Sequence, residues 1–124
     1  MRDNKQNRVS SELQIIDALK KMDDLQCKLL IVMDGNKFKS VISIGDIQRA
    51  IIKKVSLESS IQSILRENIS ISSSDDSIEK IKKRIFELRA ECMPVVDDEN
   101  HLTAVYFWED FFPNNNKRVN SNIK

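Results

Sequence analysis

Two aspartates, Asp46 and Asp110, occupy the positions in this chain that most clearly indicate chemistry. Each follows an apolar stretch and begins a stretch with helical spacing, and Ser43 lies three positions before the first of them. A carboxylate at such a junction can accept two hydrogen bonds from the cis-diol of a ribose. A serine hydroxyl and the free N–H groups of the first helical turn suit a phosphate, and Arg49, one turn after Asp46, could add a contact to it. These residue types are the ones that a ribonucleotide site would use.

The same positions also have a purely structural interpretation. An aspartate at the start of a helix is most often an N-terminal cap, worth about 1 kcal/mol. Asp110 has Phe107 at the position where Asp46 has Ser43, so the second junction lacks the hydroxyl. Spacing alone leaves both interpretations open.

Both aspartates belong to a duplicated segment. Residues 29–47 align without a gap with residues 93–111, which places Val32 on Val96 and Asp46 on Asp110. Each copy contains two apolar runs separated by a turn rich in Asp and Asn, which predicts a hairpin of buried strands. Apolar residues at helical spacing precede each hairpin, over 13–22 and 78–88. An internal repeat of this kind is the strongest fold signal in the sequence.

We therefore expect an α+β fold with two β-α-β-β-α repeats packed about a pseudo-twofold axis, because neither half has enough apolar residues to fold alone. The expected organisation is a flexible N-terminus over 1–8, a first repeat over 9–55, a bridging segment over 56–67 and a second repeat over 68–112. A polar linker or tail over 113–124 suggests that another domain follows.

Two motifs resemble the tandem cystathionine β-synthase (CBS) domain pair, or Bateman module. Met93–Asp97 (MPVVD) is similar to the "PVVD" strand of that family, and Ser43–Asp46 (SIGD) is similar to its Ser/Thr-x-x-Asp signature. Gly45–Ile51 (GDIQRAI) resembles a stretch found in CBS pairs fused to sugar-phosphate nucleotidyltransferases, with Gln48 in place of an arginine. The resemblance implies a regulatory module that is not itself an enzyme and that controls an attached catalytic domain of the nucleotidyltransferase type.

The resemblance also implies where a ligand would bind. Asp46 would hold the ribose, Ser43 and Arg49 the phosphate, and residues before and at the start of the second hairpin the base. The full set of expected ligand-binding residues is Ser43, Asp46, Arg49, Ile69, Ser70, Cys92, Met93, Pro94 and Asp110. The expected ligand is AMP, ADP, ATP or another ribonucleotide, and no cofactor is required.

Two features bear on assembly and on the alternative function. The helices expected at 46–53 and 108–112 carry apolar residues on two sides, which favours a homodimer of the kind that CBS pairs commonly form. Phe107 and Gln48 depart from the family pattern, and they support the alternative of a ligand-free dimerisation scaffold whose nucleotide sites have decayed.

Composition argues against several other classes of function. Twenty basic and nineteen acidic residues leave a net charge of +1, so the basic surface of a nucleic-acid-binding protein is missing. No apolar run approaches the roughly 20 residues of a membrane helix, and the N-terminus lacks a secretion signal. We expect a cytoplasmic protein with Cys27 and Cys92 as free thiols. One histidine, two cysteines and two glycines provide neither a metal-ligand spacing nor a phosphate-binding loop.

Overall fold

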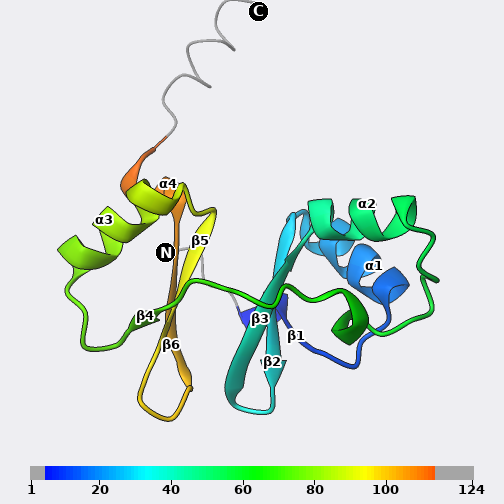
Figure 1. Ribbon diagram of the computed structural model, residues 1–124, viewed down its shortest axis with the longest axis horizontal. Helices are drawn as coiled ribbons and strands as arrows, with labels where there is room; N and C mark the ends of the chain where they lie inside the picture. Colours follow the sequence, from blue (N-terminus) through cyan, green and yellow to red (C-terminus); the bar gives the residue numbers. More distant parts are fainter. Residues whose placement is uncertain (1–4, 114–124) are drawn as a thin grey trace, which may run out of the picture.

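The chain folds into two halves, each with one small sheet (Figure 1). The computed structural model describes residues 5–113, and the expectations for residues 1–4 and 114–124, including most of the predicted tail, lie outside them. The elements of the first half are η1 (Lys5–Asn7), β1 (Arg8–Ser10), α1 (Ile15–Leu25), β2 (Leu29–Asp34), β3 (Lys37–Ser43) and α2 (Ile44–Ile52), with η2 (Ile61–Ile64) in the bridging segment. The second half contains β4 (Ser72–Ser73), α3 (Ile78–Leu88), β5 (Cys92–Val96), β6 (Leu102–Phe107) and α4 (Trp108–Phe111).

The two sheets have the same topology. In the first, β1 is parallel to β2 and β2 is antiparallel to β3; in the second, β4, β5 and β6 repeat that order. The predicted α+β fold with two β-α-β-β-α repeats is confirmed. Two local details differ from the expectation. η1 and the start of β1 fall within the segment expected to be flexible. The second repeat was expected to begin at residue 68, but its first strand, β4, has two residues and begins at Ser72.

Alternating side chains place each hairpin between two apolar layers. Along β2, Leu30 and Val32 point to the cluster under α1 and α2, whereas Leu29 and Ile31 point to a cluster that also contains Val96 of the second half. Successive strand residues face opposite sides of a sheet, so a strand that is covered on both sides is apolar throughout. The second cluster is the interface that joins the halves, and a third lies beneath α3 and α4.

The tips of the two hairpins are also joined. The backbone N–H of Phe38 donates to the carbonyl of Asn100 at 2.9 Å, and the Asn100 side-chain amide donates back to the carbonyl of Phe38 at 2.8 Å. Asn100 has φ 68°, a left-handed conformation that asparagine tolerates better than most residues. Lys37 Nζ donates to the Glu99 carbonyl at 3.1 Å. The hairpins therefore fix the relative position of the halves at one end, and the strand-to-helix junctions lie at the other.

Candidate functional site

The first strand-to-helix junction is a capping box. Ser43 ends β3 in an extended conformation, and the backbone N–H of Asp46 donates to its Oγ at 3.2 Å. The Asp46 carboxylate closes the box, because Oδ2 accepts from the Ser43 backbone N–H at 2.8 Å and from the Ser43 hydroxyl at 3.1 Å. Reciprocal bonds of this kind satisfy N–H groups that the first turn of a helix leaves unpaired. The sequence predicted Asp46 itself as the cap of a helix that starts there. In the structure α2 starts at Ile44, Ser43 is the N-cap residue, and Asp46, at the third helical position, closes the capping box.

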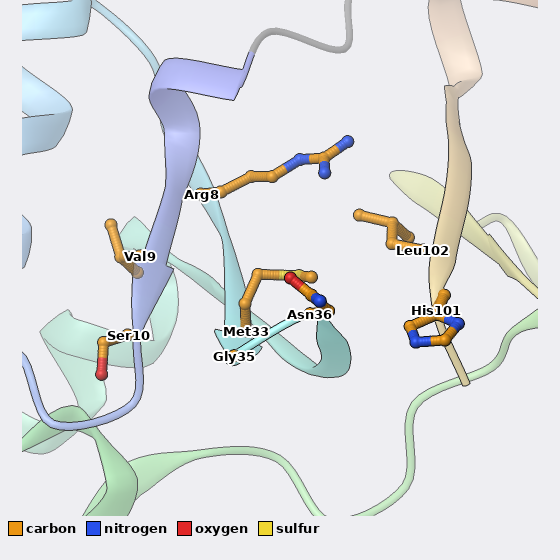
Figure 2. Close-up of a pocket in the computed structure, with 8 residues that line it drawn as sticks. All are labelled: Arg8, Val9, Ser10, Met33, Gly35, Asn36, His101 and Leu102. Atoms are coloured by element: carbon orange, nitrogen blue, oxygen red, sulfur yellow. The ribbon is translucent and has the colours of Figure 1, made fainter. Parts of the chain in front are cut away.

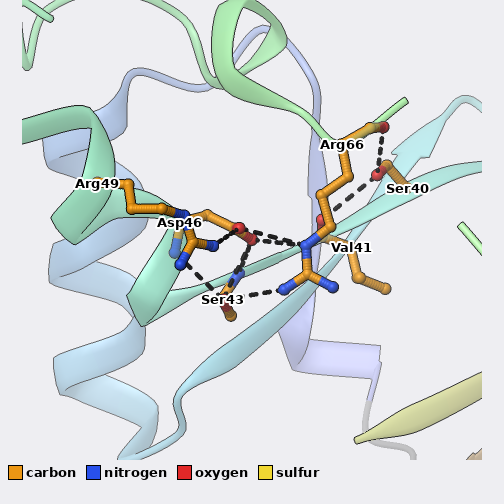
Figure 3. Close-up of polar contacts among 6 residues, drawn as sticks. All are labelled: Ser40, Val41, Ser43, Asp46, Arg49 and Arg66. Atoms are coloured by element: carbon orange, nitrogen blue, oxygen red, sulfur yellow. Dashed lines mark hydrogen bonds and ion pairs between the residues drawn. The ribbon is translucent and has the colours of Figure 1, made fainter. Parts of the chain in front are cut away.

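Two guanidinium groups also hold the Asp46 carboxylate (Figure 3). Arg49, on the next turn of α2, donates from Nη2 to Oδ1 at 2.6 Å. Arg66, which follows η2, donates from Nε to Oδ1 at 3.2 Å and to Oδ2 at 3.1 Å, and from Nη2 to the Ser43 hydroxyl at 3.1 Å. A carboxylate offers about four lone-pair sites. The lone-pair sites of the Asp46 carboxylate are therefore all occupied by donors from Ser43 and the two arginines.

The electrostatics of this cluster favour the ionised carboxylate. Burial alone would raise the pKa of Asp46. The backbone hydrogen bond from Ser43, the hydrogen bond and positive charge of Arg66 and the hydrogen bond from Arg49 outweigh burial and hold the pKa below its ordinary value. At neutral pH, Asp46 is therefore a charged group that can only accept hydrogen bonds.

The second junction has a simpler geometry. Asp110 Oδ2 accepts from the backbone N–H of Phe107 at 2.7 Å, which corresponds to the bond between Asp46 and Ser43. Phe107 has no hydroxyl to return a bond to the helix, and Asp110 has no ion pair to an arginine or lysine within residues 5–113. The two junctions therefore share a backbone shape but differ in charge environment.

A cavity of about 810 Å³ lies beside the second junction. Lys28 and Leu29 line it from the first half, and Glu91, Phe107 and Trp108 line it from the second. Its volume falls within the range typical of small-molecule sites, and its walls come from both repeats.

A cavity of about 720 Å³ lies near the other end of the sheets (Figure 2). Arg8 and Asn36 line it on the first half, and His101 and Leu102 line it on the second. Because β2 starts beside Ser43 and ends at the hairpin, this cavity is separated from Asp46 by the length of a strand.

The residues expected to contact a base are not all oriented alike. Cys92 and Ile69 pack against the cluster between the halves, and strand alternation places Pro94 on the same face of β5 as Cys92. Met93 is fully buried under α3, in the cluster beneath the helices of the second half, so its side chain faces away from the interface. Ser70 is exposed. The interface at the first junction contains three residues of this group: Cys92, Ile69 and Pro94. Met93 could contact a ligand there only through its backbone.

The two cysteines are free thiols. Burial, reinforced by the negative charge of Glu91, raises the pKa of Cys92 to about 12, although Arg66 opposes the shift. Cys92 therefore stays protonated at neutral pH.

Arg66 is the member of the cluster that the sequence did not reveal. It lies twenty positions after Asp46, in a bridging segment that has no counterpart in the other repeat, and no neighbouring residue in the sequence indicates a contact with a carboxylate.

Gly45 has no steric requirement at this junction. A Cβ at Gly45 would meet its nearest atom, Ser43 Oγ, at an ordinary contact distance of 3.6 Å.

Solved structures share the fold of this chain. A CBS domain protein from Pyrobaculum aerophilum complexed with AMP superposes with a TM-score of 0.71 at 15% identity, over 94% of this chain and 91% of that chain. A CBS domain pair in complex with 5′-methylthioadenosine and S-adenosyl-L-methionine gives a TM-score of 0.68 at 20% identity, over 94% and 89%. The fold is that of a CBS domain pair. OpuCA of Staphylococcus aureus is also similar to this chain, with a TM-score of 0.72 at 19% identity over 93% of this chain and 92% of that chain.

The comparison of sequences gives a different result from the comparison of structures. No protein-family model and no curated protein matches the chain. At the identities found, structural similarity establishes the fold, and the chemistry of this chain has to be argued from its own residues.

Residues 5–113 contain no group of three or more His, Cys, Asp or Glu side chains that could hold a metal ion. Over the same residues, none of the helices is sufficiently long and apolar to cross a bilayer.

Proposed function

We propose that this chain is a regulatory module that binds a ribonucleotide in the cleft between its two CBS repeats. The observation that carries the proposal is Asp46, an ionised carboxylate with a side chain only 7% exposed, placed at a strand-to-helix junction among arginines. A buried carboxylate of this kind can take the two hydroxyl groups of a ribose, and neighbouring cations suit a phosphate. Two structures of the same fold contain adenosine-type ligands, which supports this class of ligand.

The proposed mechanism is a shift between two relative orientations of the repeats. A nucleotide that contacts Asp46 from the first half and Cys92 and Pro94 from the second would favour the orientation in which both sets of contacts form. Ligand binding can shift a conformational equilibrium only by its difference in affinity for the two states. The attached effector would be a sugar-phosphate nucleotidyltransferase, which is supported by the sequence of Gly45–Ile51 alone.

The module would act as a homodimer through its exposed apolar helices. On α2, the side chains of Ile51 and Ile52 are 49% and 77% exposed, and on α3 Phe86 and Leu88 are about half exposed. Sedimentation velocity should give a dimer, and Ile52→Lys should shift it towards monomer because the lysine would place a charge in the contact. The matched change Lys53→Ala, on the same helix end, should leave the dimer intact. A wild-type monomer at high micromolar concentration would overturn this part of the proposal.

Calorimetric titration with AMP, ADP, ATP, CMP and GMP tests nucleotide binding directly. At least one should bind with a Kd below about 1 mM, which corresponds to roughly 4 kcal/mol. The 2′-deoxy form of the best ligand should then bind about tenfold more weakly, because it loses one hydrogen bond to a charged carboxylate. This comparison changes the ligand and leaves the fold of the protein untouched.

A ligand-free dimerisation scaffold is the alternative, favoured by Phe107 at the second junction and by the filled acceptor sites of Asp46. It predicts that none of the five nucleotides binds below millimolar concentration while the dimer persists. If the ribose and deoxyribose forms bound with equal affinity, nucleotide binding would stand, but Asp46 would not be part of the site.

A further inference from the structure

The first junction is already occupied by a part of the chain itself. Arg66 comes from the bridging segment and belongs to neither repeat, yet its guanidinium contacts both Asp46 oxygens and the Ser43 hydroxyl. Arg49 takes the remaining position on Oδ1. A ribose diol that approaches Asp46 must therefore displace a donor that is already bound.

The donors differ in how readily they can leave. The Ser43 contacts are part of the capping box of α2, and the Ser43 residue is buried. The side chains of Arg66 and Arg49 are 40% and 62% exposed, and both have long flexible stems. Entry of a ligand thus exchanges guanidinium contacts for hydroxyl contacts and leaves the start of α2 intact.

This exchange treats charged and uncharged ligands differently. An uncharged nucleoside replaces charge-assisted bonds at Asp46 with hydroxyl bonds and offers nothing to the two released guanidiniums. A phosphate-bearing nucleotide offers them a second anion, to which arginine can bind in a bidentate manner. Only the phosphate-bearing ligand recovers the ion pairs that its ribose disrupts.

We propose that Arg66 acts as an internal occupant of Asp46 and makes the site selective for ribonucleotides that carry a phosphate over uncharged nucleosides. The inference rests on the proposed nucleotide site at Asp46, and it adds the ligand class and the residue that sets it. Arg66 would close the carboxylate in the absence of ligand and contact the phosphate in its presence.

Titration of wild type and Arg66→Gln with AMP and with adenosine tests the selection. Wild type should bind AMP at least about tenfold more tightly than adenosine. In Arg66→Gln, adenosine should bind more tightly than in wild type and AMP less tightly, so that the ratio falls by about tenfold or more. Lys83→Ala, which removes an exposed charge from α3, should leave the ratio unchanged. Parallel changes in both ligands, or an unchanged ratio, would overturn the role of Arg66.

A measurement on wild type keeps the test decisive even where Arg66→Gln fails to fold. Raising the salt concentration should weaken AMP binding, because phosphate pairs are screened, and should leave adenosine binding unchanged or improve it, because the Arg66–Asp46 pair is screened as well. Equal salt dependence of the two ligands would refute the inference while nucleotide binding stands. Failure of both ligands and of every nucleotide in the panel to bind wild type would refute the proposed function itself.

Discussion

The ion pair between Asp46 and Arg66 should be measurable as a coupling free energy in a double-mutant cycle. Asp46→Asn keeps a side-chain oxygen that can accept from the Ser43 backbone N–H, so the variant loses mainly the attraction to Arg49 and Arg66. Hydrogen bonds to charged groups contribute about 1.5 to 3 kcal/mol when buried, whereas exposed ion pairs contribute about 0.2 to 1 kcal/mol.

The exposure of each partner decides where this pair falls between the two limits. The Asp46 side chain is 7% exposed and the Arg66 side chain 40%, so the arginine regains part of its hydration when the pair is broken. We expect Asp46→Asn to lower the free energy of unfolding by about 1 to 2 kcal/mol and Arg66→Gln by about 1 kcal/mol. The double variant should resemble Asp46→Asn, which gives a coupling of about 1 kcal/mol.

Urea denaturation followed by the fluorescence of Trp108 and by circular dichroism would measure all four proteins of the cycle. The matched control is the cycle of Lys80, in the first turn of α3, with Asp76, which lies just before that helix; their Nζ and Oδ1 atoms are 3.1 Å apart. Its coupling should be smaller, because both side chains are more exposed to water than those of Asp46 and Arg66. Additive effects of Asp46→Asn and Arg66→Gln, within about 0.3 kcal/mol, would refute the arrangement of the first junction.

Three further predictions concern acid stability, the hairpin contact and thiol reactivity. The pKa of Asp46 is lower in the folded chain than in the unfolded chain, so its contribution to stability should be complete above about pH 4 and lost as the pH falls through the folded pKa. In urea denaturation at a series of acidic pH values, Asp46→Asn should reduce the dependence of the free energy of unfolding on pH. Asn100→Gly should lower the free energy of unfolding by about 1 kcal/mol, because the bond to the Phe38 carbonyl is lost. Asn100→Ala should lower it by about 1 kcal/mol more, because φ is 68° at this position. Equal denaturation curves for the two variants would contradict this prediction. In a Cys27→Ser background, Cys92 should react with a thiol reagent at pH 8 only slowly until urea unfolds the chain, because its pKa is about 12; rapid labelling of the folded protein would disprove its protonation.

The sequence determined the architecture because the patterns involved are local and occur in both repeats. The apolar run at 29–33 and the turn that contains Gly35 specify a hairpin without reference to the rest of the chain, and the gapless duplication extends the result to the second half. The capping box is equally local, since Ser43 and Asp46 are three positions apart and the start of a helix needs acceptors for its unpaired N–H groups. For these reasons the fold and the candidate carboxylate were both predictable.

The tertiary structure decided which partners those local elements meet. The placement of Arg66 on Asp46 spans twenty positions and depends on the path of the bridging segment, while the contact of Asn100 with Phe38 depends on how the halves close. Met93 belongs to the predicted binding strand, yet the pleat turns its side chain into the core under α3. Sequence periodicity specifies that a residue is buried. Only the packing of the two halves specifies which surface or charged group the residue contacts, because the chain has several apolar faces and several cations that could occupy each position.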